Sequence, residues 1–220
     1  MTVAAIVLVP DVAAALADAA GEPAIRRVVH AAWAGGAMPI VVVADDATGS
    51  LAEVVAGLPA TLASPAGTQP GIAWFIAGQR AATAVVAETA AGLLWPFRHA
   101  WVDPETVTSL VEAHGATPQA ILRPSYGGQP GFPILVPTDL TDRLAARGGI
   151  NGAEAVASLI AEGVSTRTIE LGDPGIVHDM ATPRSSLPGY QGPPQPAAGS
   201  PPEWNAELAA DAQRSGEPAP

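Results

Sequence analysis

The sequence contains no cysteine and no lysine, and only 5% of its residues are aromatic. Without cysteine, the chain can form neither a disulfide nor a thiolate metal site. Without lysine, no ammonium side chain is available to neutralise a phosphate, so a reaction that needs one cannot be run by this chain alone. The lack of disulfides agrees with a cytoplasmic location, which we expect for this protein.

Long apolar runs and excess positive charge are also missing. No uninterrupted apolar stretch approaches the ~18 residues of a membrane-spanning helix, and the N-terminal stretch has no basic segment of the signal-peptide type. We therefore expect no membrane partner. The formal net charge is -11, which predicts that nucleic acid is not a partner either.

Apolar runs of strand length alternate with stretches of helical periodicity. Strands are predicted at 3–9, 39–43, 93–97, 120–123, 132–136 and 164–171, and a loop is predicted at 61–71. Such alternation is typical of βαβ units around a mainly parallel sheet. Ligands of these sheets bind beyond the carboxyl ends of the strands, so we expect a site in the loops after Val9, Phe97, Arg123 and Ile176.

Two helix starts carry clear signals. Asp103-Pro104-Glu105 supplies a capping carboxylate, a proline for the first turn and an acid beside the positive helix end. A second helix is predicted after Pro23 and ends at Gly35-Gly36. Its apolar stripe, which we expect to be buried, consists of Ile25, Val28, Val29, Ala32 and Trp33.

Composition divides the chain into a domain at 1–187 and a tail at 188–220. The tail is rich in proline, glycine and alanine, so we predict that it is mostly disordered. A short helix is possible at 203–213, with Trp204 and Leu208 four residues apart on one face. This helix is a candidate for docking into a protein partner. The alternative is an unselected tail with transient helicity.

Several segments in a fixed order resemble one known family. They are Ala5–Val9, Gly21-Glu22-Pro23, Arg26–Val29, Pro39–Val43, Trp101–Val107 and Pro124–Leu135. In order and spacing they are similar to the MobA-like nucleotidyltransferases, within the molybdenum cofactor cytidylyltransferase branch, over roughly Thr2–Leu187. The resemblance implies a Rossmann-like, three-layer α/β/α fold. It also implies Mg²⁺-dependent transfer of a nucleoside monophosphate from CTP or GTP to the pterin phosphate of the molybdenum cofactor.

The residues that this chemistry requires are mostly replaced. The family's glycine-rich first loop, with its arginine and lysine, corresponds here to Pro10–Ala20, which has no glycine, no cation and two acids. Arg98 stands where the resemblance places a magnesium-binding aspartate, and arginine cannot ligate Mg²⁺. The later Gly-Asp element corresponds to Gly149-Ile150, with Glu154 in place of a downstream arginine. Of the acids in the family's Asp-x-Asp-Thr-Pro, Asp179 is retained and the second is Ala181.

We therefore predict a catalytically degenerate member of the family, with no catalytic residue, no metal ligand and no cofactor of its own. Candidate ligand-binding residues lie in the segment that best matches the family, and they are Tyr126, Gly127, Gly128 and Gly131. The alternative for this segment is a plain glycine-rich turn between two strands. Arg123 is a further candidate ligand-binding residue. Arg98 and His99 are candidates for an anion site, and the alternative for this pair is a solvated loop pair.

An active transferase with rearranged chemistry is the rival hypothesis. It would use Arg26, Arg80 or Arg98 for phosphates, and Mg²⁺ and CTP or GTP would then be its cofactor and substrate. Its metal ligands would be drawn from Asp11, Asp18 and Asp179.

Overall fold

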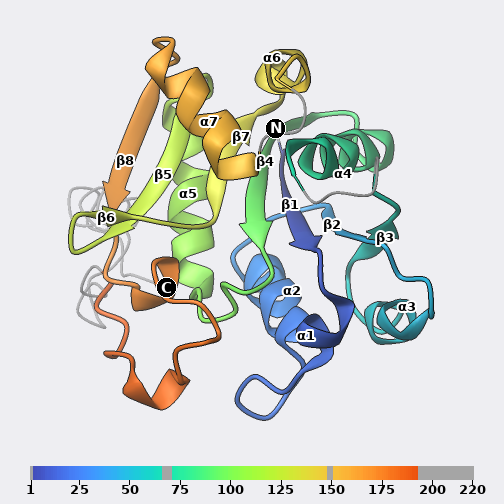
Figure 1. The fold of residues 1–220 in the computed structure, drawn as a ribbon. Coiled ribbons are helices and arrows are strands. Elements are labelled where there is room, and N and C mark those ends of the chain that lie inside the picture. The colour runs from blue at the N-terminus through green and yellow to red at the C-terminus, as the bar shows by residue number, and fades with distance from the viewer. Residues whose placement is uncertain (1, 66–70, 148–150, 193–220) are drawn as a thin grey trace, which may run out of the picture.

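In the computed structural model, residues 2–65, 71–147 and 151–192 are described, and they form one sheet with helices on both faces (Figure 1). The alternation seen in the sequence is therefore confirmed. The strands are β1 (Thr2–Val9), β2 (Ile40–Ala44), β3 (Thr61–Ala63), β4 (Thr89–Pro96), β5 (Ile121–Tyr126), β6 (Gln129–Pro130), β7 (Ile134–Pro137) and β8 (Thr166–Glu170).

The strand order is β3-β2-β1-β4-β7-β5-β6, with β8 paired to β5. Four pairings are parallel, namely β1 with β2, β1 with β4, β2 with β3, and β5 with β8. The short strands β6 and β7 run antiparallel to β5, and β7 is also antiparallel to β4. The sheet is thus mostly parallel, as predicted, with the antiparallel strand β7 inserted between β4 and β5.

The helices cover the sheet in two layers. They are α1 (Val12–Leu16), α2 (Ala24–Ala34), α3 (Ser50–Val55), α4 (Ile72–Val85), α5 (Pro104–Ala116), α6 (Thr141–Ala145) and α7 (Gly152–Ala161), with 3-10 turns η1 (Thr138–Leu140), η2 (Pro174–Ile176) and η3 (Arg184–Ser186). Alternate side chains of β1 point to opposite faces. Val3, Ala5, Val7 and Val9 belong to the core under α2 and α5, whereas Ala4, Ile6 and Leu8 belong to the core under α4 and α7.

Two expectations were wrong. Trp33, placed on the buried stripe of α2, is 48% exposed, because the helical spacing of 3.6 residues per turn points it away from the buried Val28, Ala31 and Ala32. The predicted loop at 61–71 begins with the strand β3, whose Leu62 pairs with Val42. A strand of three residues is too short to show an alternating pattern, so its partner strand decides its conformation.

The helix cap at Asp103 is confirmed, and one predicted helix falls outside the described residues. Asp103 caps α5 by accepting a hydrogen bond from the Glu105 amide at 3.0 Å. Within the described residues, no helix has the length and apolar character needed to cross a membrane. The possible helix at 203–213, with Trp204 and Leu208, lies outside the described residues.

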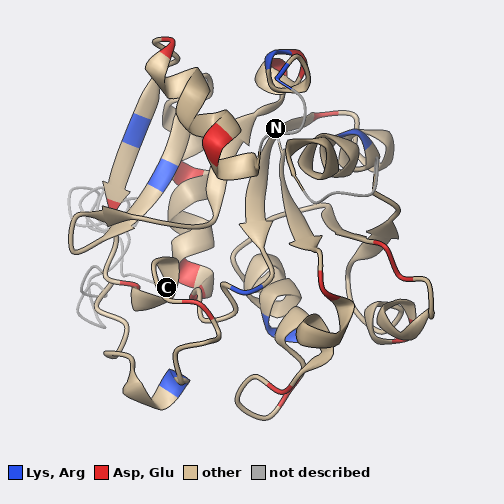
Figure 2. Cartoon of the chain, in the orientation of Figure 1, with Lys and Arg blue, Asp and Glu red and all other residues tan. Residues whose placement is uncertain are grey.

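The carboxyl ends of β1, β2, β4, β5 and β8 lie at one edge of the sheet, because these strands run in the same direction (Figure 1). The loops that follow these strands therefore meet there. Acidic segments recur along this edge (Figure 2). In the sequence, Asp11 and Asp18 follow β1, and Asp45 and Asp46 follow β2. This is where the sequence predicts a ligand site.

Candidate functional site

The loop after β1 satisfies its own backbone donors. Asp11 caps α1 by accepting a hydrogen bond from the Ala14 amide at 3.0 Å. Asp18 accepts from the Gly21 amide at 3.0 Å, and the Ala19 amide donates to the Glu22 carbonyl at 2.7 Å. Amides that cradle a phosphate must be unpaired and free of nearby negative charge. This loop instead offers its amides to its own carboxylates and carbonyls.

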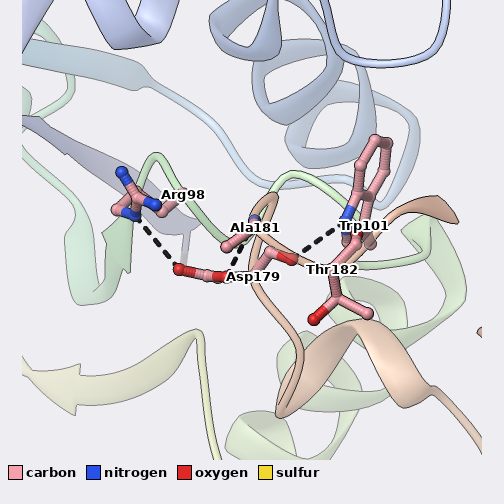
Figure 3. Close-up of polar contacts among 5 residues, drawn as sticks. All are labelled: Arg98, Trp101, Asp179, Ala181 and Thr182. Atoms are coloured by element: carbon pink, nitrogen blue, oxygen red, sulfur yellow. Dashed lines mark hydrogen bonds and ion pairs between the residues drawn. The ribbon is translucent and has the colours of Figure 1, made fainter.

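Arg98 and Asp179 form an ion pair at the centre of the site (Figure 3). The Arg98 Nε atom donates to Asp179 Oδ2 at 3.1 Å, and the Met180 amide donates to the Arg98 carbonyl at 2.8 Å. These contacts join the loop after β4 to the segment after β8, although the two residues are 81 positions apart. The structure thus brings together two positions at which the family resemblance implies magnesium ligands.

Hydrogen bonds set the protonation of Asp179. Partial burial by itself would raise the pKa of this carboxyl, but the Ala181 amide and the Arg98 guanidinium donate to it and hold its pKa below the usual value. Asp179 is therefore ionised at neutral pH, and the Arg98 guanidinium balances its charge.

Trp101 fixes the same segment from the other side. Its indole Nε1 atom donates to the carbonyls of Asp179 at 3.1 Å and Thr182 at 2.9 Å (Figure 3). The ring is 7% exposed, and the Arg27 guanidinium lies 5.3 Å from its centroid. The loop after β4 and the segment 178–182 therefore form one braced unit.

His99 is adjacent to Arg98 but is not a second cation. Its ring packs against the Phe132 ring at 4.8 Å, and its Nδ1 atom is buried without a partner among the described residues. Burial lowers the pKa of His99, so the ring is neutral at neutral pH. Arg98 is exposed and His99 is half-buried, so the anion site and the solvated loop pair both stay predictions.

The segment Tyr126–Gly131 is a tight hairpin between β5 and β6. Tyr126 pairs with Gln129, and Gly127 and Gly128 have φ values of 58° and 76°, as the two central residues of a type I′ turn require. At Gly131, a Cβ atom would lie 2.1 Å from the Ile176 carbonyl oxygen, so only glycine lets the hairpin contact η2. The glycine-rich turn expected as the alternative for this segment is therefore present, and its ligand role stays a prediction.

Tyr126 and Gly127 also line a groove of about 680 Å³ with Glu170, Leu171, Gly172, Gln191 and Gly192. Arg123 is not among the residues that line this groove, and its ligand role stays a prediction. The structure thus separates the sequence-predicted residues into two groups. Arg98 and His99 lie in the braced unit, whereas Tyr126, Gly127 and Gly128 lie at the hairpin.

The comparisons with known proteins agree with this fold. The family model described as the MobA-like NTP transferase domain matches residues 14–166. The chain belongs to this family. No curated protein sequence matches it.

Solved structures of nucleotidyltransferases share the fold. A nucleotidyl transferase from Methanothermobacter thermautotrophicus superposes with a TM-score of 0.66 at 18% identity, over 80% of this chain and 91% of that one. A 4-diphosphocytidyl-2C-methyl-D-erythritol synthase gives 0.62 at 17% identity, over 84% and 94% of the two chains. Molybdopterin-guanine dinucleotide biosynthesis protein A from Archaeoglobus fulgidus gives 0.53 at 15% identity, over 76% and 82%. At these identities the likeness shows the fold alone.

The acids of this MobA-like domain do not assemble a metal site among the described residues, where no group of three or more histidine, aspartate or glutamate side chains is placed to hold an ion. Asp11 and Asp18 are each engaged with a backbone amide of their own loop. Arg80 lies on α4 and lines a hollow with Thr89 and Thr138, at the edge opposite the carboxyl ends of the strands. Of the residues that the rival hypothesis requires, Arg80 therefore lies away from the site.

Sequence reasoning missed Asp173 and Glu170. Asp173 is 2% exposed and accepts hydrogen bonds from the Asp103 amide, the Thr106 hydroxyl and the Gly175 amide at 2.7–2.8 Å. Burial raises the pKa of its carboxyl despite these donors. Asp173-Pro174 repeats the capping pattern of Asp103-Pro104, a signal that the sequence does contain. Glu170 has no such signal, because only the pairing of β8 with β5 brings it to Ser125.

Proposed function

We propose that this MobA-like domain is a catalytically degenerate nucleotidyltransferase that binds a ligand or a protein partner in the maturation of molybdenum enzymes. The link to molybdenum comes from the family resemblance and from the Archaeoglobus relative, whose name assigns it to molybdopterin-guanine dinucleotide biosynthesis. The site that would carry the binding function is the carboxyl edge of the sheet.

One observation carries the proposal, namely the Arg98–Asp179 ion pair. Nucleotidyl transfer needs divalent metal to neutralise a triphosphate, and carboxylates are the ligands that hold it. Here a guanidinium takes one of the implied carboxylate positions and binds the carboxylate at the other. A divalent metal ion would have to displace Arg98 from Asp179, and the nearby guanidinium would repel it.

The loop after β1 supports the same conclusion. The amides of Ala14, Ala19 and Gly21 are paired within the loop, and the carboxylates of Asp11 and Asp18 would repel a triphosphate. Because the chain contains no lysine, no ammonium compensates for this repulsion. The cytoplasmic location and a partner of the tail segment around Trp204 and Leu208 stay predictions from the sequence.

Calorimetric titration with CTP and GTP, each with and without Mg²⁺, tests the proposal. We expect no Mg²⁺-dependent heat for either nucleotide. A thermal shift of several degrees with Mg-CTP would contradict the proposal and favour the rival transferase. The rival also predicts pyrophosphate release that depends on a cofactor phosphate and is lost in Arg98→Ala, whereas we expect no release with any nucleotide or metal.

A further inference from the structure

The groove beside the β5–β6 hairpin contains one fixed negative charge. The carboxylate of Glu170 accepts a hydrogen bond from the Ser125 hydroxyl at 2.6 Å through its Oε2 atom. The Gly128 amide donates to Oε2 at 3.2 Å and to Oε1 at 3.3 Å. These contacts hold the carboxylate in one place, so a ligand would not have to order it.

This carboxylate occupies the amides of the hairpin turn. The Ser125 hydroxyl, followed by the Gly128 and Gly127 amides, holds the pKa of Glu170 below its usual range. Successive turn amides are otherwise a place for an anion. With Glu170 seated on them, the groove repels a phosphate and carries net negative charge at neutral pH.

Glu170 lacks a countercharge within the described residues. No described arginine or histidine forms an ion pair with it. The Gly128 amide lies 3.3 Å from its Oε1 atom, a long contact, so this oxygen retains acceptor capacity toward the groove. Tyr126 lines the same groove, and an aromatic face attracts a cation.

We propose that this groove is a binding site for an organic cation, a ligand that carries an ammonium or guanidinium group. The cationic group donates to Glu170 Oε1 and lies against the Tyr126 ring, while the remainder of the ligand contacts Leu171 and Gln191. A groove of about 680 Å³ has the size of a small-molecule site. The net charge of -11 adds a long-range attraction for cations. The inference deepens the proposed function, since it gives the ligand class of a non-catalytic site.

The test is a titration of the full chain with agmatine, a small guanidinium amine. The amide NMR signals of Gly127 and Gly128 monitor the binding. Low ionic strength is used because salt screens the attraction. Glu170→Gln keeps an acceptor for Ser125 and Gly128 but removes the charge, and we expect roughly tenfold weaker binding. Glu112→Gln, an exposed acid on α5, makes the same change in net charge and is expected to bind as the wild type does.

Two further variants examine the aromatic contact. Tyr126→Phe keeps the ring face and should bind agmatine as the wild type does, whereas Tyr126→Leu should bind a few-fold more weakly. Inorganic phosphate should leave the Gly127 and Gly128 signals unchanged.

The inference is overturned if the wild type does not bind agmatine, if Glu170→Gln and Glu112→Gln bind it equally, or if phosphate occupies the hairpin amides. These outcomes are separate from the nucleotide titration. Mg-CTP binding would contradict the proposed function. Agmatine binding that is equally strong in the wild type and in Glu170→Gln would contradict only the ligand class.

Discussion

At the scale of single residues, Arg98 and Asp179 determine the charge of the site. Their side chains are 47% and 33% exposed, so the ion pair itself contributes little to stability. Its effect is chemical, because it keeps a guanidinium beside the one implied metal ligand that the chain retains.

Arg98→Asp should convert this ion pair into a pair of carboxylates and raise the affinity for Mn²⁺ several-fold, since carboxylate oxygens are its preferred ligands. Arg98→Gln removes the guanidinium without adding an acid and is the matched control. Both variants should lose no more than about 1 kcal/mol of stability. Electron paramagnetic resonance of bound Mn²⁺ measures the affinity, and equal affinities in the two variants would show that the position is not a metal-ligand position.

His99 and His114 make stability depend on pH. Burial lowers the pKa of both rings, and both nitrogens of His114 lack partners among the described residues. As the pH falls through the ordinary histidine pKa of about 6.5, these rings therefore bind protons in the unfolded chain but stay neutral in the folded protein. The free energy of unfolding should fall as pH decreases below 6.5 toward the lowered pKa values.

His114→Leu should make this pH dependence shallower, because it removes one of the two buried rings. Chemical denaturation at pH 7.5, 6.5, 5.5 and 5.0 measures the effect. The difference between the two slopes cannot exceed the ~1.4 kcal/mol per pH unit that one proton supplies. Parallel curves for the variant and the wild type would contradict the assignment of His114 as a neutral buried ring.

At the scale of elements, helix ends and close approaches hold the loops in position. Asp103 caps α5 with its side chain, and its backbone amide donates to Asp173, so one residue connects a helix start to the segment after β8. Asp103→Ala should cost about 1 kcal/mol through loss of the cap. Asp103→Asn, which can still cap, should cost much less in the same denaturation experiment.

The contact between the hairpin and η2 depends on Gly131. Gly131→Ala would place a methyl group against the Ile176 carbonyl, and backbone cannot move away as a flexible side chain can. We expect a loss of about 1–3 kcal/mol. Gly57→Ala is the matched control, since a Cβ there meets no atom within 4 Å and its change should be close to zero. Equal thermal shifts in the two variants would show that the close approach is absent.

At the scale of the whole molecule, residues 172–192 close the carboxyl edge of the sheet. The Gln191 amide donates to the Gly172 carbonyl at 2.7 Å, and Leu187 packs against the core under α2 and α5. Because the composition of the tail predicts disorder, we expect a chain ending at Gly192 to unfold within about 2 °C of the full chain. A chain ending at Leu171 loses the partners of Trp101 and Asp103, and its Tm should fall by roughly 10 °C. Differential scanning calorimetry compares the three chains.

The sequence by itself determined the fold class, most element positions and the cap at Asp103. These depend on the period of apolar residues and on local hydrogen bonds, which a linear pattern records. It also determined the family, through the order of short segments, and the lack of glycine and lysine where a phosphate loop would need them.

Only the tertiary structure decided which side chains meet. The Arg98–Asp179 pair and the contact of Glu170 with Ser125 join residues that are 81 and 45 positions apart. The burial of His99 against Phe132, the exposure of Trp33 and the short strand β3 follow from neighbours in space. Strand order sets these contacts, and strand order is a property of the assembled sheet that no local pattern encodes.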